Sequence, residues 1–239
     1  MFLFLLAQVA QPSCPDQIAA DPVKAAEAAQ SWAGRGGGAL ARQCAGLAYV
    51  AQERWAEAAS AFEQAAREAK PEEKVAAANL WVQAGNARLA GADPRGAIAA
   101  FDRALVTGLL SGPAKGEVRL DRARANVAAG DAQAARADLD EALKAVPEDP
   151  LAWLLSASLA RRMEQLDRAQ ADIAEAAKRS PDDSAVALEA GRIALAAGSP
   201  AAARLAFEAA MRNQPGGEAA KAAQAELDRL GAPASPPTR

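Results

Sequence analysis

The chain has 239 residues, of which 51% are hydrophobic and only 4% aromatic, with alanine supplying much of the hydrophobic fraction. This composition favours an all-helical protein of thin layers over one thick core, because alanine is the best helix former and lets helices approach closely. The net charge of −3, with both signs mixed along the chain, argues against a nucleic-acid binder. With no histidine and two cysteines, the chain offers no metal site, and we expect no cofactor.

The chain begins MFLFLLAQVAQPS, in which Phe2 to Ala10 form an apolar run. The run has the length of a signal-peptide core and is too short to span a bilayer. It is atypical, because no basic residue precedes it and Gln8 would occupy the minus-three position of a cut after Ala10. We expect residues 1–13 to be a signal or leader segment of a periplasmic or secreted protein. The alternative is a short helix packed against the helices that follow, in a cytoplasmic protein.

Cys14 and Cys44 are the two cysteines of the chain. They fit export, because an exported pair can form a disulfide. Closing a loop of this size would stabilise the protein by roughly 3–4 kcal/mol in the chain-entropy model. The alternative is that both are buried thiols that behave as small apolar side chains. We therefore treat Cys14 and Cys44 as a candidate disulfide.

An N-terminal cap is predicted next along the chain. Asp21-Pro22 predicts the start of a helix that runs to about Trp32, since aspartate is a preferred N-cap and proline suits the first helical position. The glycine-rich run 34–38 contains a Gly-x-Gly spacing that can mark phosphate binding. No strand precedes it and no Gly-Lys-Ser/Thr follows it, so we interpret it as a linker.

Five later segments share one pattern, centred on a large apolar residue at Phe62, Phe101, Leu139, Ile173 and Phe207. Alanine stands four positions before and three positions after each centre. Residues at these spacings lie on one face of a helix, so the pattern predicts a face that reads small, large, small. The small residues let a neighbouring helix come close, and the large one fills the space between them.

Each of these helices is preceded by another helix with its own stripe, and the pattern resembles the tetratricopeptide repeat of bacterial type. That repeat is a helix–turn–helix unit of about 34 residues. Trp81 and Trp153 match its aromatic position, and its small position is matched by Gly46, Gly85, Ala123, Ala157 and Gly191. The resemblance implies an all-α fold, a right-handed α-solenoid of stacked helix–turn–helix repeats.

The register divides the chain as follows. We place five repeats at 39–72, 78–111, 116–149, 150–183 and 184–217. Residues 14–38 become an N-terminal capping half-repeat with its glycine-rich joint. Residues 218–231 become a C-terminal capping helix, because terminal repeats need a polar outer face. We expect residues 232–239, which are rich in proline, to be a disordered tail.

The resemblance also implies a concave groove, lined by the first helix of each repeat, that holds an extended peptide or a helix of a partner protein. The register assigns to this groove Gln43, Leu47, Asn79, Val82, Asn86, Leu89, Glu117, Leu120, Arg124, Val127, Leu151, Leu154, Ser158, Arg161, Arg162, Leu188, Arg192 and Leu195. The set is apolar with a cationic C-terminal half, which predicts a partner peptide with apolar anchors and acidic character. The alternative is that these arginines only solvate a helix face.

An enzyme is not expected. Carboxylates such as Asp138, Asp140 and Glu141 lie on helix surfaces that we expect to face water, and no acid–base pair is singled out. The predicted function is a non-enzymatic protein–protein interaction scaffold or adaptor in the cell envelope. The alternatives are a cytoplasmic regulator or adaptor and an accessory subunit of an enzyme complex.

Overall fold

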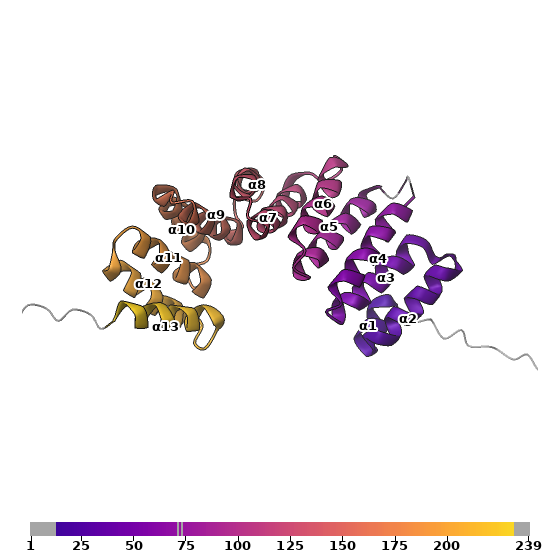
Figure 1. Ribbon diagram of the computed structural model, residues 1–239, viewed down its shortest axis with the longest axis horizontal. Helices are drawn as coiled ribbons and strands as arrows, with labels where there is room; N and C mark the ends of the chain where they lie inside the picture. Colours follow the sequence, from indigo (N-terminus) through magenta and orange to yellow (C-terminus); the bar gives the residue numbers. More distant parts are fainter. Residues whose placement is uncertain (1–12, 71, 73, 232–239) are drawn as a thin grey trace, which may run out of the picture. The chain divides into compact units, whose positions relative to one another are not determined.

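The computed structural model describes residues 13–70, 72 and 74–231, and this part of the chain contains helices and no strand (Figure 1). The predicted fold class is confirmed: consecutive helices form pairs, and within each of two units the pairs stack on their neighbours. Most of the leader expected at 1–13, and the tail expected at 232–239, lie outside the described residues. None of the described helices is long and apolar enough to cross a membrane.

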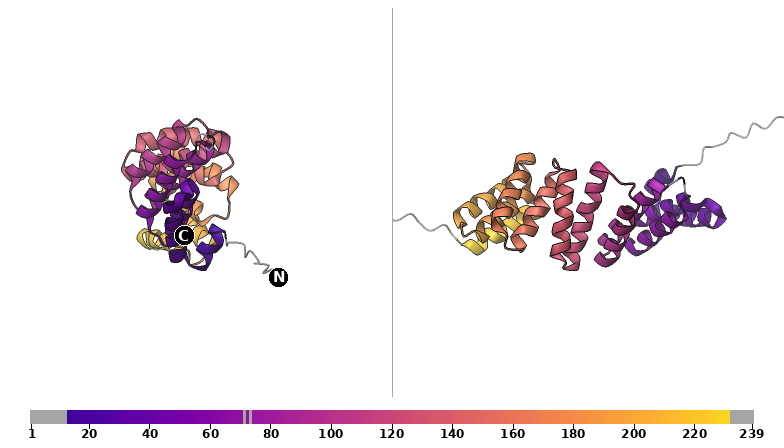
Figure 2. Two further views of the ribbon diagram at one scale, coloured as in Figure 1. Left: turned by 90° about the vertical axis from the view of Figure 1, so that its right-hand side faces the viewer. Right: turned by 90° about the horizontal axis from the view of Figure 1, so that it is seen from above.

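The structure divides into two compact units between Ser111 and Gly112. The described helices of the first unit are α1 (Cys14–Ala20), α2 (Pro22–Trp32), α3 (Gly38–Ala51), α4 (Trp55–Glu68), α5 (Lys74–Ala90) and α6 (Pro94–Val106). Those of the second unit are α7 (Gly112–Ala129), α8 (Ala132–Ala145), α9 (Pro150–Arg162), α10 (Leu166–Arg179), α11 (Ser184–Ala196), α12 (Pro200–Asn213) and α13 (Glu218–Leu230). Within each unit, successive helices lie side by side (Figure 2).

The small–large–small face packs as its sequence predicts. Phe62, Phe101 and Phe207 are among the largest fully buried side chains. Each ring lies against the glycine of the preceding helix: a Cβ built on Gly46 would come within 2.6 Å of the Phe62 ring. Gly85 and Gly191 face their phenylalanines in the same way. Burying one such side chain contributes about 1.5–3 kcal/mol, so these contacts are a main source of stability.

Aspartates cap several of the helices. The Asp131 carboxylate accepts a hydrogen bond from the Ala134 N–H at 2.9 Å, and Asp93 accepts one from the Gly96 N–H at 2.9 Å. That backbone bond, with the Arg88 guanidinium, holds the pKa of Asp93 below its usual range. Asp149 and Asp183 cap α9 and α11 in the same way. Ser199 occupies the N-cap position of α12 but makes no side-chain capping bond.

The glycine-rich run 34–38, for which the sequence predicts a linker, connects two helices through a kink. The helix expected from Asp21-Pro22 is α2, capped by the Asp21 side chain. Residues Ala33–Gly37 lead from α2 into α3, and the backbone of Arg35 and Gly36 is not helical. The chain kinks at Gly36, whose φ of 91° suits a residue without a side chain.

Candidate functional site

A cleft of about 170 Å³ lies on the second unit between α7 and α9. Its polar lining comes from Arg124 on α7 and from Ser158 and Arg162 on α9. Its apolar lining consists of Ala123, Val127, Leu139, Leu155 and Leu159. The cleft therefore offers an apolar floor beside two guanidinium groups, and it lies between the first helices of two adjacent pairs.

The arginines near this face differ in how far they are neutralised. Arg161 pairs with Glu189 of α11 at 2.6 Å, and Arg192 lies 3.8 Å from Glu189 and 3.5 Å from Glu226 of α13. Glu189 is buried, and its carboxylate lies close to both of these arginines. The cationic character expected for Arg161 and Arg192 is thus cancelled within the protein.

The two arginines of the cleft keep their charge available. Among the residues that the structure describes, Arg124 pairs with Asp121, one turn away on the same helix at 3.2 Å, and a solvent-exposed pair of this kind contributes little. Arg162 is exposed and has no ion-pair partner within the described part of the chain. An acidic group that enters the cleft would therefore meet Arg162 and Arg124, and not Arg161 or Arg192.

Some residues assigned to the groove belong to the core. Leu120 is 5% exposed and packs with Leu139 and Leu159, and Leu188 is 8% exposed and packs against Phe207. Leu154 is half-buried against a third cluster that includes Ile173. These side chains pack into the core between the helices, so they offer little surface to a partner.

The first unit presents an uncharged set of predicted groove residues. Asn79 and Asn86 are exposed on α5, whereas Val82 and Leu89 on the same helix are half-buried. Leu47 on α3 is 38% exposed. These residues can make hydrogen bonds and apolar contacts, but they offer no group that attracts an ion.

The structure joins Cys14 of α1 to Cys44 of α3 in a disulfide, with a Cα–Cα distance of 5.9 Å. The bond ties the N-terminal cap to the first full helix pair. The sequence alone left open the alternative that both cysteines are free thiols, and the structure differs from that alternative.

The carboxylates expected on open helix surfaces are in part buried. Asp138 is 3% exposed, accepts a hydrogen bond from the Arg122 guanidinium at 2.9 Å and another from Asn126 at 3.0 Å. The expectation that Asp138 faces water is therefore wrong, because a cation on the neighbouring helix makes its burial tolerable. Glu141 remains exposed and pairs with Lys144 at 2.6 Å.

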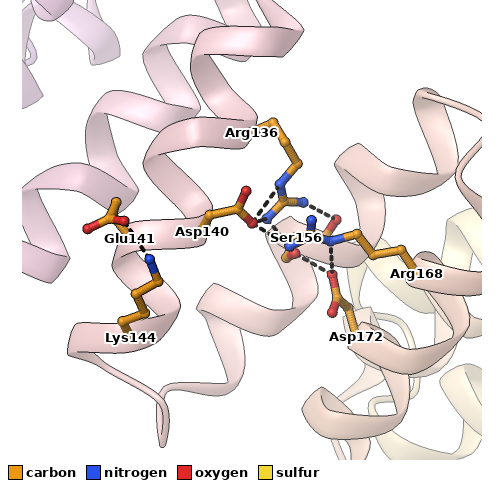
Figure 3. Close-up of polar contacts among 7 residues, drawn as sticks. All are labelled: Arg136, Asp140, Glu141, Lys144, Ser156, Arg168 and Asp172. Carbon is orange, nitrogen blue, oxygen red and sulfur yellow. Dashed lines mark hydrogen bonds and ion pairs between the residues drawn. The ribbon is translucent and has the colours of Figure 1, made fainter.

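An ion network joins α8, α9 and α10 (Figure 3). Arg136 donates to Ser156 Oγ at 2.9 Å and lies 3.0 Å from Asp140, which also contacts Arg168. Ser156 in turn contacts Asp172. Burial lowers the pKa of Arg136, and the nearby Arg168 acts in the same direction. Two cations and two anions neutralise one another here, so the network links α8, α9 and α10 by charged hydrogen bonds.

The corresponding place in the first unit is open. Ala45 and Ala61 precede Gly46 and Phe62, just as Ser156 and Asp172 precede Ala157 and Ile173. A cleft of about 420 Å³ lies there between α2 and α4, over α3, and it also includes Gln30, Arg42, Tyr49, Glu57, Ser60 and Gln64. Sequence reasoning missed this cleft, and the two alanines alone do not indicate it, because Ala84 with Ala100 and Ala190 with Ala206 stand at the equivalent places of other repeats.

Comparisons with known proteins agree with the helix-pair pattern. Two family models, each described as tetratricopeptide repeat, match residues 116–159 and 154–218. None of the curated proteins compared with this sequence matches it.

Several solved structures share the fold. YrrB, described as a TPR protein with an unusual peptide-binding site, is 19% identical, with a TM-score of 0.61 over 84% of this chain and 100% of that one. PilW, described as a widely conserved type IV pilus biogenesis factor, is 21% identical, with a TM-score of 0.67 over 87% and 93%. The pilF protein of Pseudomonas aeruginosa is 14% identical, with a TM-score of 0.63 over 88% and 99%. At these identities the likeness concerns the fold alone.

The repeats matched by the family models are generally non-catalytic and serve as protein–protein interaction scaffolds. Fold, register and family models agree on the same helices of the second unit. Residues 116–218 match the tetratricopeptide repeat family, and the solved structures show that the chain shares the fold of such repeats.

Proposed function

We propose that this protein is a non-enzymatic adaptor of the cell envelope that binds an acidic, apolar-anchored segment of a partner protein on the first helices of its repeats. The cleft between α7 and α9 is the central subsite. The observation that carries the proposal is the pairing of an apolar floor with two available guanidinium groups in one small cleft.

The chemistry of the cleft supports a carboxylate next to an apolar side chain. Arginine presents a planar fork of donors that matches a carboxylate in two-point fashion. Leu155 and Val127 offer an apolar wall beside Arg124 and Arg162. The Ser158 hydroxyl adds a group that can donate to a peptide carbonyl or accept from a peptide N–H. A volume of about 170 Å³ suits one or two partner side chains and is small for a whole cofactor.

The Cys14–Cys44 disulfide supports an envelope location. Disulfides persist in oxidising compartments such as the bacterial periplasm and are rare in the cytosol. The apolar run Phe2 to Ala10 points the same way.

In-cell photo-crosslinking tests the partner site. A photoreactive benzophenone amino acid is placed at Ser158, within the cleft, or at Arg212, exposed on α12 of the same unit, as the matched control. We expect one specific protein adduct from position 158 that position 212 does not give. The adduct at 158 should disappear when Arg124→Glu and Arg162→Glu are added. Equal capture at both positions, or an adduct that survives both charge reversals, contradicts the proposal.

Cell fractionation with thiol labelling tests the location. We expect the protein in the periplasmic or secreted fraction, with Cys14 and Cys44 inert to a maleimide until a reductant is added. Recovery in the cytosol with both thiols labelled would favour the cytoplasmic adaptor instead.

A further inference from the structure

Another cleft of the first unit lies beside Trp81 of α5. It has a volume of about 220 Å³, and its walls come mainly from α4 and α6, the second helices of two adjacent pairs. The residues that line it are Glu63, Arg67, Trp81, Arg88, Gly96, Ala99, Ala100 and Arg103. All of them belong to the first unit, so this cleft is separate from the one between α7 and α9.

The Trp81 ring holds two guanidinium groups beside this cleft. Arg67 Cζ lies 5.6 Å from the ring centroid and Arg103 Cζ lies 4.8 Å from it. An aromatic ring attracts a guanidinium at such a distance, and a stacked arginine can still donate from the N–H groups in its own plane. Trp81 is only 9% exposed, so core packing fixes the ring. Two donor groups are therefore positioned before any ligand arrives, which lowers the entropy cost of binding one.

The carboxylates beside the cleft contact mainly a third arginine. Glu63 accepts hydrogen bonds from Arg88 Nε and Nη2 at 2.9 and 2.6 Å, and Asp93 accepts one from Arg88 Nη1 at 2.8 Å. These hydrogen bonds to Glu63 and Asp93 raise the pKa of Arg88. Arg67 is exposed and lies 3.5 Å from Glu63. Arg103 is exposed and has no ion-pair partner among the residues that the structure describes, so positive charge remains on both sides of Trp81.

Trp153 of the second unit gives an internal contrast. Arg179 Cζ lies 5.2 Å from its ring, but this arginine also pairs with Glu175 at 2.7 Å and lies 3.7 Å from Glu148. One stacked arginine meets two carboxylates there. An arginine stacked on tryptophan is thus not available to a ligand in every repeat, and the arginines at Trp81 differ by their lack of such neutralisation.

We propose that the α4–α6 cleft is a second protein-docking site, which binds a segment of a partner protein that carries two aspartate or glutamate side chains. Arg67 takes one carboxylate and Arg103 takes the other, since the guanidinium fork matches a carboxylate. Ala99 and Ala100 contact the methylene groups of these acidic side chains. The occupant is a protein segment, because the cleft is small for a cofactor and the chain has the fold of an interaction scaffold.

This site goes beyond the groove proposed above, because the groove is formed by first helices and the α4–α6 cleft mainly by second helices. It does not depend on the α7–α9 cleft, since the two clefts share no residue. An acidic partner can therefore engage either cleft alone.

An NMR titration of the full-length protein with blocked hexaglutamate tests the site. The probe signal is the Trp81 indole N–H, which Trp81→Phe identifies by its disappearance. We expect this signal to shift saturably with hexaglutamate and to stay unchanged with blocked hexaglutamine. Arg103→Gln should weaken the affinity read from this signal by at least about tenfold, because a hydrogen bond between charged groups is lost. Circular dichroism should show this variant folded, since the side chain is exposed.

Arg95→Gln is the matched control, because Arg95 is an exposed arginine of α6 that does not line the cleft. It should bind hexaglutamate as the wild type does. The proposal is overturned if hexaglutamate leaves the Trp81 signal unchanged, if Arg103→Gln keeps the wild-type affinity, or if Arg95→Gln loses as much. The Ser158 amide reports separately on the α7–α9 cleft: Arg124→Glu with Arg162→Glu should remove its response and leave that of Trp81 intact.

Discussion

The two units present different chemistry on the first helices of their pairs. In the first unit, the predicted groove residues of α3 and α5 are uncharged, with Asn79 and Asn86 exposed. In the second unit, α7, α9 and α11 carry arginines on this face, and Arg124 of α7 and Arg162 of α9 line a cleft with an apolar floor. The same backbone plan therefore supports a neutral surface in one unit and a cationic one in the other.

This difference shows that an arginine on the groove face is not available to a ligand merely because of its position on that face. Arg161 and Arg192 share the face with Arg162, yet the first pairs with the buried Glu189 and the second lies close to both Glu189 and Glu226. A charge held by a buried counter-charge attracts an acidic ligand less than one that is unpaired or in an exposed pair. The second unit should thus dominate recognition, and the first should add contact area.

The largest expected change in stability comes from substitutions that destabilise one unit and leave the other folded. Phe207→Ala removes a fully buried ring of the second unit, and Phe101→Ala removes its counterpart in the first. Each should destabilise its own unit by about 3–5 kcal/mol, because the ring leaves a cavity against a glycine. Hydrogen exchange should localise the loss to α11–α12 or to α5–α6.

Binding to the crosslinked partner then distinguishes the units. We expect Phe207→Ala to abolish binding and Phe101→Ala to weaken it only severalfold. Val106→Ala, at a side chain that is 85% exposed, is the control and should be neutral. The proposed difference between the units would be contradicted if Phe101→Ala lost binding at a temperature where the amides of α7–α13 stay protected from hydrogen exchange.

A second prediction concerns the buried counter-charge of the second unit. Glu189→Gln removes the anion that Arg161 contacts at 2.6 Å, which should destabilise the protein by about 1–3 kcal/mol because a charged hydrogen bond is lost in a buried place. It also frees positive charge on the face, so affinity for an acidic partner should rise severalfold. Urea unfolding and binding titration measure the two effects.

Glu141→Gln is the matched control for that change. It breaks the exposed pair with Lys144, so stability should change by less than about 0.5 kcal/mol. Unaltered partner affinity in Glu189→Gln would mean that Arg161 and Arg192 lie outside the binding surface.

A third prediction tests the apolar wall of the cleft. Leu155→Ala should weaken partner binding by about tenfold, since the half-buried leucine contributes roughly 1–2 kcal/mol of apolar contact. The exposed Leu205→Ala on α12 is the control. If both changes weaken binding equally, the cleft has no special part in it.

The smallest effect is expected at the neutral face. Asn86→Ala on α5 removes one exposed amide and should change binding by less than about 0.5 kcal/mol and leave the melting temperature unaltered. A loss as large as that of Leu155→Ala would place a main anchor in the first unit, contrary to the comparison.

The fold was predictable because local signals agree. Alanine around a central large residue marks the packed face, and aspartates such as Asp93 and Asp131 mark helix starts. These signals depend on spacing within one helix, which the sequence displays directly. The glycine-rich run 34–38 marks the connection between α2 and α3, since such a composition favours a linker, but the kink at Gly36 could not be placed from composition alone.

The candidate site was predictable only in part. Leu120 and Leu188 lie at the margin of the helix face, and the approach of the neighbouring helix decides whether such a side chain is covered. The pairing of Arg161 with Glu189 joins residues 28 positions apart, and no rule of helical spacing connects them. Arg162 could be assigned to the face, but its freedom from partners became visible only with the neighbouring helices in place.

The most direct measurement is the affinity of the crosslinked partner segment for the wild-type protein, for Arg162→Glu and for Arg212→Glu, each over a range of salt concentrations. We predict that Arg162→Glu weakens binding by about 100-fold and flattens the salt dependence, because reversing a charge in the cleft replaces attraction with repulsion. Arg212→Glu should bind as the wild type does. Equal affinities for all three proteins would contradict the proposal that the α7–α9 cleft recognises an acidic partner.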